Sequence, residues 1–259
     1  MSFVQFVVEP KGTFHEFGTE KEYIIDHDKS FEEIKEQYKK IINDVKHSLF
    51  IYTITSNNED EDKMIKLADY LLNIGTDING PEGEVEYIID RPLAAAMEEP
   101  SNGKFRTKII KWLIDNGASV TKNDGLPHIL RACEINDLSI IKTMVEKGAN
   151  IKDLSEDNED NVLTLAMFKN YSFDVIKYLV DNGADVNYRI PYGSSVLMIA
   201  CIYCDVQVVK YLIDNSADIH ARDKYGLTPL AYAIEAGNKS VVKFIKEYID
   251  KKTDERTNS

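Results

Sequence analysis

Features of membrane-spanning, secreted and lipid-anchored chains are missing from this sequence. No stretch of its 259 residues approaches the roughly 18 consecutive apolar residues of a transmembrane helix. The opening residues MSFVQFVVEP lack the basic start and the long apolar run of a secretory signal. Ser2 stands where myristoylation requires glycine, and the final residues ERTNS contain no cysteine for prenylation. We therefore expect a cytoplasmic protein that does not bind a membrane.

Motifs of catalysis and of cofactor binding are missing too. The sequence contains no G-x-S-x-G, no P-loop and no G-x-G-x-x-G, and its five histidines lack the spacing of metal ligands. Acidic runs at residues 59–62 and 156–160 lack the alternating ligands and the central glycine of a calcium loop. We predict no catalytic residue, no cofactor and no metal site, and therefore a protein that is not an enzyme.

Basic residues are fewer than acidic residues in this sequence. The chain has 31 Lys and Arg against 44 Asp and Glu, which gives a net charge of −13. Such a surface repels phosphate backbones and anionic lipids, so nucleic acid and membrane surfaces are poor partners. A basic protein or peptide fits this charge better.

What the sequence does contain is an internal repeat. The stretch 192–221 recurs with variations before and after itself, with Gly226 lying 33 residues after Gly193. In the same way Ala217 lies 33 residues after Ala184. A period near 33, built from two short helical patterns and a turn, is typical of a stacked-repeat solenoid.

The second helix of each repeat has four apolar residues on one face, at positions eight, seven, four and three before a turn. The turn residue is glycine in four sets, because the chain must adopt positive φ there. Ser216 replaces it in the fifth set, at a cost of about 1 kcal/mol. The five sets are Leu67, Ala68, Leu71 and Leu72; Ile109, Ile110, Leu113 and Ile114; Ile140, Ile141, Met144 and Val145; Val175, Ile176, Leu179 and Val180; and Val208, Val209, Leu212 and Ile213.

The first helix of each repeat has a small residue at a fixed place, which lets neighbouring helices approach closely. An aliphatic residue precedes it by three positions, and we expect both to lie in the core. The small residues are Ala96, Ala132, Ala166, Ala200 and Ala233, and the aliphatic residues are Leu93, Ile129, Leu163, Leu197 and Leu230.

These residues resemble the ankyrin repeat family. The stretch 226–233 reads GLTPLAYA, close to the family's G-x-T-P-L-H-x-A, and GADVN at 183–187 matches the element after the second helix. The resemblance implies an all-α ankyrin-repeat solenoid of about six helix-turn-helix units over residues 45–250. It also implies a binding scaffold that presents turn tips and a concave helix face to partner proteins.

Residues 1–44 are predicted to form an N-terminal segment with a capping helix. Short strands are expected at residues 3–8 and 23–25, paired as a hairpin on the end of the solenoid. A helix is expected to begin at Ser30, with Glu33 completing a capping box. In the last repeat Lys246 replaces an apolar residue, as a terminal repeat needs for solubility. Residues 251–259 are predicted to be a disordered tail.

Cysteine is scarce, and three cysteines do not build a disulfide framework. Cys201 and Cys204 form a CxxC pair, as in redox sites and in half of a zinc site. Their repeat register favours buried structural positions, because Cys201 follows Ala200 as Cys133 follows Ala132. A metal or redox protein that uses these three cysteines remains an alternative of another class.

Apolar and aromatic residues recur on one side of the aligned repeats, at turn tips and on the open side of the first helices. We call these residues the apolar stripe and predict that they bind a partner protein. The N-terminal segment or a second copy of the chain would be other occupants of the stripe. An inhibitor or immunity-type protein that sequesters a basic enzyme is the runner-up function. The predicted binding residues are Tyr87, Ile88, Leu126, Ile135, Phe168, Lys169, Tyr192, Ile202, Tyr203, Tyr225 and Leu227.

Overall fold

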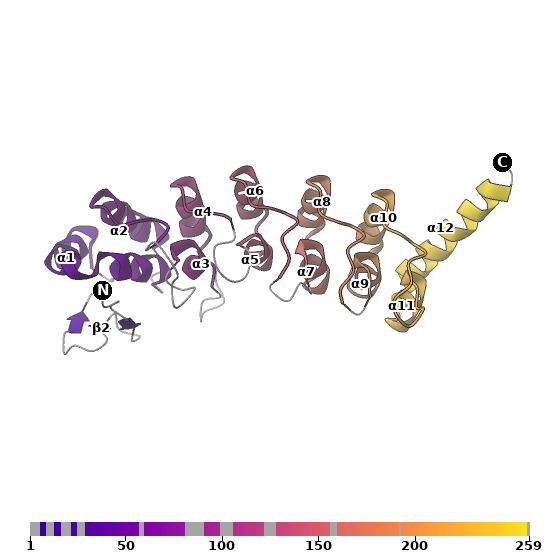
Figure 1. Cartoon of the computed structure of the whole chain (residues 1–259), viewed down its shortest axis with the longest axis horizontal. Coiled ribbons are helices and arrows are strands. Elements are labelled where there is room, and N and C mark those ends of the chain that lie inside the picture. Colours follow the sequence, from indigo (N-terminus) through magenta and orange to yellow (C-terminus); the bar gives the residue numbers. More distant parts are fainter. Residues whose placement is uncertain are drawn as a thin grey trace. The chain divides into compact units, whose positions relative to one another are not determined.

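The computed structural model of the chain is drawn in Figure 1. The chain forms two compact units, residues 1–120 and 121–259. The described residues are 6–8, 13–16, 22–24, 29–56, 60–80, 91–98, 106–121, 128–155, 160–191 and 193–257. Among them, no helix is both long enough and apolar enough to cross a membrane.

The first unit opens with a small antiparallel sheet of strand order β1-β2-β3. Its strands are β1 (Phe6–Val8), β2 (Thr13–Glu16) and β3 (Glu22–Ile24). The two predicted strands exist, but the predicted hairpin between them is wrong, because β2 lies between them and pairs with both. The sequence TFHE is too short to show an alternating pattern by itself, and β2 was therefore not predicted.

The helices of the first unit are α1 (Phe31–Thr55), α2 (Glu61–Asn73), α3 (Pro92–Met97) and α4 (Thr107–Asp115). The capping box at the start of α1 is confirmed, since the backbone N–H of Ser30 donates to Glu33 Oε2 at 3.1 Å. The predicted boundary after residue 44 falls inside α1 and marks no break in the chain. Neither glycine nor proline occurs between Phe31 and Thr55, so nothing stops the helix there.

In the described part of the second unit, the helices form four pairs. The pairs are arranged in two rows (Figure 1). The first-helix row holds α5 (His128–Ile135), α7 (Val162–Phe168), α9 (Val196–Tyr203) and α11 (Pro229–Glu235). The second-helix row holds α6 (Leu138–Glu146), α8 (Phe173–Asp181), α10 (Val206–Asp214) and α12 (Lys239–Thr257). Each helix packs against its pair partner and against the next helix of its row in most repeats.

The core of the second unit follows the predicted pattern. Ala132, Ala166, Ala200 and Ala233 are fully buried, as close packing between the first helices requires. The apolar faces of α6, α8 and α10 are buried as well, apart from Val145, which is half-buried. Burying one such aliphatic side chain contributes about 1.5–3 kcal/mol, so these repeated faces account for much of the fold's stability.

The turns after the second helices have the predicted backbone. Gly183 has a φ of 91° and Ser216, at the same place one repeat later, has a φ of 73°. Both N–H groups close the end of the preceding helix, through bonds to Val180 and Ile213 carbonyls at 3.0 Å. The serine therefore adopts a left-handed conformation that glycine adopts without strain.

The last helix corrects one prediction. The disordered tail predicted from residue 251 is wrong as far as Thr257, because α12 continues to that residue. The stretch KKTDERT is rich in helix-forming lysine, glutamate and arginine and contains no glycine or proline. Lys246 is exposed, in agreement with the polar outer position predicted for it, while Val241 and Ile245 are buried.

Candidate functional site

The predicted binding residues are only partly within the described structure. Tyr87, Ile88, Leu126 and Tyr192 lie outside the described residues. The other seven lie in the second unit, on the first-helix row or on the turn before α11. Among the described residues, the geometry of the candidate site therefore rests on Ile135, Phe168, Lys169, Ile202, Tyr203, Tyr225 and Leu227.

Two aromatic rings form the centre of this surface. Phe168 ends α7 and Tyr203 ends α9, and their ring centroids lie 5.6 Å apart in an edge-to-face arrangement. Phe168 is 42% exposed and Tyr203 is 47% exposed, so the two rings pack together while about half of each residue stays open to solvent. Packing of α7 against α9 holds the two rings together.

The flanking residues are less exposed. Ile135 ends α5 and Ile202 precedes Tyr203, and both are half-buried. Lys169 follows Phe168 and is exposed. The described surface is thus an aromatic pair with aliphatic neighbours and a charged rim, an arrangement common to protein interfaces.

The turn before α11 presents two further apolar side chains. Tyr225 is 75% exposed and Leu227 is 38% exposed. Asp223 fixes the turn, since its Oδ1 accepts from the backbone N–H of Tyr225 at 2.9 Å and of Leu227 at 2.8 Å. Its Oδ2 accepts from the Tyr232 hydroxyl at 2.8 Å. One buried carboxylate therefore sets the shape of the whole turn tip.

The pKa of Asp223 reflects these bonds. Burial alone would raise it, but the hydrogen bonds from Tyr232 and from the backbone of the turn outweigh burial and hold the pKa below its usual value. The carboxylate is consequently charged at neutral pH, as a triple acceptor must be.

Hydrogen bonds also tie one turn to the next. Arg189 donates from Nη1 to the Gly193 carbonyl at 3.0 Å and to the Arg222 carbonyl of the following repeat at 2.8 Å. Ser194 and Tyr232 lie 2.8 Å apart, and the serine is the donor because the tyrosine proton goes to Asp223. The last two turns are therefore held in register by side chains as well as by helix packing.

One exposed apolar residue was missed by the sequence analysis. Ile234 is 55% exposed, although the residues at its place in the three preceding repeats are fully buried. Those residues are Cys133, Met167 and Cys201, each directly after the small alanine. No sequence signal distinguishes Ile234, because an apolar residue occupies this position in all four repeats.

The cysteines lie inside the repeats. Cys133, Cys201 and Cys204 are buried, and burial raises the pKa of each thiol to about 12. The Cys204 thiol lies 3.4 Å from the Met167 sulfur. Metal binding and redox exchange both need the thiolate, which these surroundings disfavour. Within the part of the chain that the structure describes, no group of three or more His, Cys, Asp or Glu side chains is placed to hold a metal ion.

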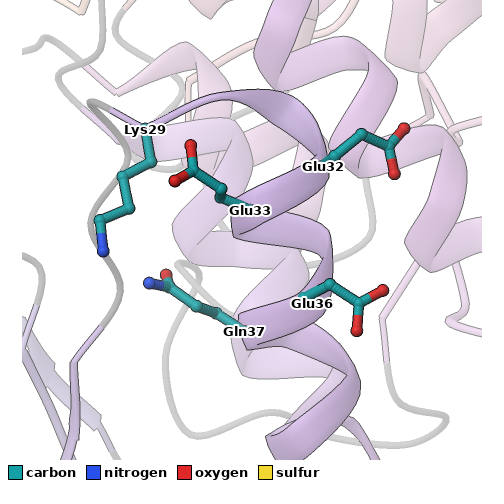
Figure 2. A pocket seen from close by; sticks show the side chains of 5 residues that line it. All are labelled: Lys29, Glu32, Glu33, Glu36 and Gln37. Atoms are coloured by element: carbon teal, nitrogen blue, oxygen red, sulfur yellow. The ribbon is translucent and has the colours of Figure 1, made fainter.

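A shallow hollow lies on α1 of the first unit (Figure 2). Its lining is Lys29, Glu32, Glu33, Glu36 and Gln37, which all lie on or beside the first turns of the helix. Ser30 donates its hydroxyl to Glu33 Oε2 at 2.6 Å, and Glu36 pairs with Lys39 at 2.5 Å. These contacts are those of an ordinary solvated helix start, so the hollow adds nothing to the candidate site.

Stacked helix pairs with buried alanines and exposed aromatics on one row define a helical-repeat solenoid. The family model for ankyrin repeats (three copies) matches residues 93–190 and 189–255, well over half of the chain. The chain belongs to the ankyrin repeat family. Ankyrin repeats generally mediate protein–protein interactions, and the family is generally not enzymatic.

Two curated proteins are similar to parts of the chain. An ankyrin repeat protein of Acanthamoeba polyphaga mimivirus is 24% identical over 156 residues, which cover 58% of this chain. An alpha-latrocrustotoxin of Latrodectus tredecimguttatus is 30% identical over 130 residues, which cover 49% of this chain. The chain spans 49% of the first protein's length and 8% of the second's.

Proposed function

We propose that this protein is a non-enzymatic interaction scaffold that binds a partner protein through its turn tips and the family's concave helix face. The observation that carries the proposal is the half-exposed aromatic pair of Phe168 and Tyr203. Tyrosine and tryptophan are enriched among the few residues that supply most of the binding energy at protein interfaces. Truncating such a residue to alanine costs about 2 kcal/mol or more of binding free energy.

The proposed partner is basic or offers an apolar anchor to the aromatic pair. The chain has a net charge of −13, and most of the excess of Asp and Glu lies in residues 1–120. Long-range attraction of this kind raises the association rate and is screened by salt. The aromatic pair would then determine how slowly the complex dissociates.

A pull-down from extract of the native cell tests the proposal. Phe168→Ala/Tyr203→Ala should lose the polypeptide that the wild type retains, because the anchor for its apolar group is removed. The matched control is Phe173→Ala/Tyr211→Ala, which removes an edge-to-face pair with centroids 5.4 Å apart on the second-helix row. The control should retain the same polypeptide.

Circular dichroism of each variant must first confirm that the fold persists. If both variants retain the same polypeptide, the aromatic pair is not the binding surface. If the wild type holds no polypeptide above background, the scaffold proposal itself fails. A tight one-to-one complex with a basic enzyme, whose activity is lost on binding, would establish the inhibitor function in place of a general scaffold.

A further inference from the structure

Each inner repeat of the second unit offers its neighbour the same face. The residue after the small alanine is fully buried in α5, α7 and α9, where the next first helix covers it. The turns are equally close, since a Cβ built on Gly193 would lie 3.1 Å from the backbone nitrogen of Lys224 in the next repeat. These positions are therefore built for contact with another helix pair.

On α11 this face is open. Ile234 is 55% exposed and Leu227 is 38% exposed, and a Cβ on Gly226 would meet nothing within 4 Å. Arg222 donates to the Gly226 carbonyl at 3.0 Å, just as Arg189 donates to the Gly193 carbonyl one repeat earlier. Figure 1 shows α11 at the end of the first-helix row, followed by α12 alone among the described residues.

We propose that this end face, defined by Leu227, Ala231 and Ile234, is the interface of a homodimer in which α11 packs antiparallel against α11 of a second copy. A two-fold axis that passes between Leu230 and Ala231 places Ile234 of one copy opposite Leu227 of the other. Because the contact is symmetric, the pairing of Ile234 with Leu227 occurs twice, and both exposed aliphatic side chains of each copy are covered. The small Ala231 beside the axis lets the two helices approach closely.

Charge favours the antiparallel arrangement. Arg222 and Lys224 lie in the turn before α11, and Glu235 ends the helix. Antiparallel helices bring the basic turn of one copy beside the glutamate of the other, whereas parallel helices would align like charges. The dipoles of the two short helices also oppose each other. A second copy therefore matches the face in apolar content and in sign of charge.

The interface is distinct from the aromatic pair of the proposed function. Phe168 and Tyr203 end α7 and α9, whereas the dimer face is on the outer side of α11. The apolar patch is small, so we expect a weak dimer whose population rises with protein concentration. Leu227 belongs both to the apolar stripe and to the dimer face, whereas Ile234 lies outside the stripe, so a change at Ile234 separates pairing of α11 from binding of a partner to the aromatic pair.

Sedimentation velocity of the full 259-residue chain, from about 1 to 100 µM, tests the dimer. The wild type should shift from monomer to dimer with concentration, and Ile234→Glu should weaken association at least ten-fold, since it sets a charge against Leu227 and beside Glu235. The control Tyr203→Glu adds the same charge at a residue of similar exposure and should dimerise as the wild type does. A wild type that stays monomeric at 100 µM overturns the proposal.

Mixing two variants tests the antiparallel geometry and guards against misfolding. Leu227→Lys alone should weaken association to a similar extent as Ile234→Glu. An equimolar mixture of Ile234→Glu chains and Leu227→Lys chains should recover the dimer, because the new glutamate faces the new lysine and the other apolar contact is intact. No recovery from two folded variants, or loss of the dimer with Tyr203→Glu, contradicts the proposed interface. If a variant loses partner capture but still dimerises, the result bears on the aromatic pair and not on the dimer interface.

Discussion

Asp223 shows how one side chain can set the shape of a turn. Its carboxylate accepts two backbone N–H groups and the Tyr232 hydroxyl, and so joins the turn tip to α11. Tyr232 also contacts Ser194 of the preceding repeat, so Asp223 is linked through Tyr232 to two consecutive repeats. The charge on this carboxylate is therefore a structural component of the last repeat.

Acid should destabilise this turn. The folded-state pKa of Asp223 is lowered, so its contribution to stability is present above the unfolded pKa of about 3.9 and is lost as pH falls through the folded value. We expect Asp223→Asn to lower the melting temperature at pH 7 and to flatten the loss of stability between about pH 5 and 3. Melting curves followed by circular dichroism at a series of pH values measure this.

The control is Asp218→Asn, which alters an exposed turn aspartate that accepts the His220 N–H at 2.9 Å. Equal pH profiles for wild type and Asp223→Asn would show that this carboxylate does not hold the turn.

The cysteines give a second prediction at the same scale. Since burial raises the pKa of each thiol to about 12, almost no thiolate exists at pH 8 and reagents cannot reach it. A chromogenic thiol reagent should therefore label the native protein only as fast as it unfolds, and should label all three cysteines at once in urea. Rapid labelling of one cysteine in the folded protein would return the redox alternative to consideration.

At the scale of the element, the turn after each second helix controls stability. Ser216 adopts a φ of 73°, where Gly183 one repeat earlier adopts 91°. Ser216→Gly should raise the free energy of unfolding by about 1 kcal/mol, after the greater freedom of glycine in the unfolded chain is taken into account. Urea unfolding of the two proteins measures the difference.

The reverse change is the matched control. A Cβ on Gly183 would meet nothing within 4 Å, so Gly183→Ser tests backbone conformation without steric conflict. It should destabilise the protein by a similar amount. If Ser216→Gly is neutral and Gly183→Ser is costly, the two turns are not equivalent and the repeat alignment at Ser216 needs revision.

Elements that recur could be predicted from the sequence together with their buried faces. Of the elements that occur once, β1, β3 and the capped start of α1 were predicted, but β2 and the full length of α1 were not. The faces of α6, α8 and α10 were predicted because one spacing appears in every repeat. Strand β2 has no such copy, and the continuity of α1 across residue 44 contradicts a boundary drawn only where the repeats begin. Ile234 is exposed because, among the described residues, no following first helix packs on it. The sequence of its own repeat does not show this.

At the scale of the whole molecule, stability is shared between neighbours. Helices of the second unit contact their pair partners and the adjacent repeats, and the bonds from Arg189 and Ser194 each reach one repeat onward. In such an array the total stability is close to a sum of repeat and nearest-neighbour terms. A surface residue such as Tyr203 can therefore change without disturbing distant repeats, which suits a fold whose function depends on its surface.

Neighbour-only packing has a consequence for synthesis on the ribosome. Each helix pair finds the residues that cover it within the next few tens of positions of the chain, as the short-range contacts between α5, α7, α9 and α11 illustrate. Proteins dominated by such local contacts fold quickly. Repeats of the second unit can therefore fold one after another while the remainder of the chain is still being translated. Little apolar surface then stays exposed to other proteins in the crowded cell.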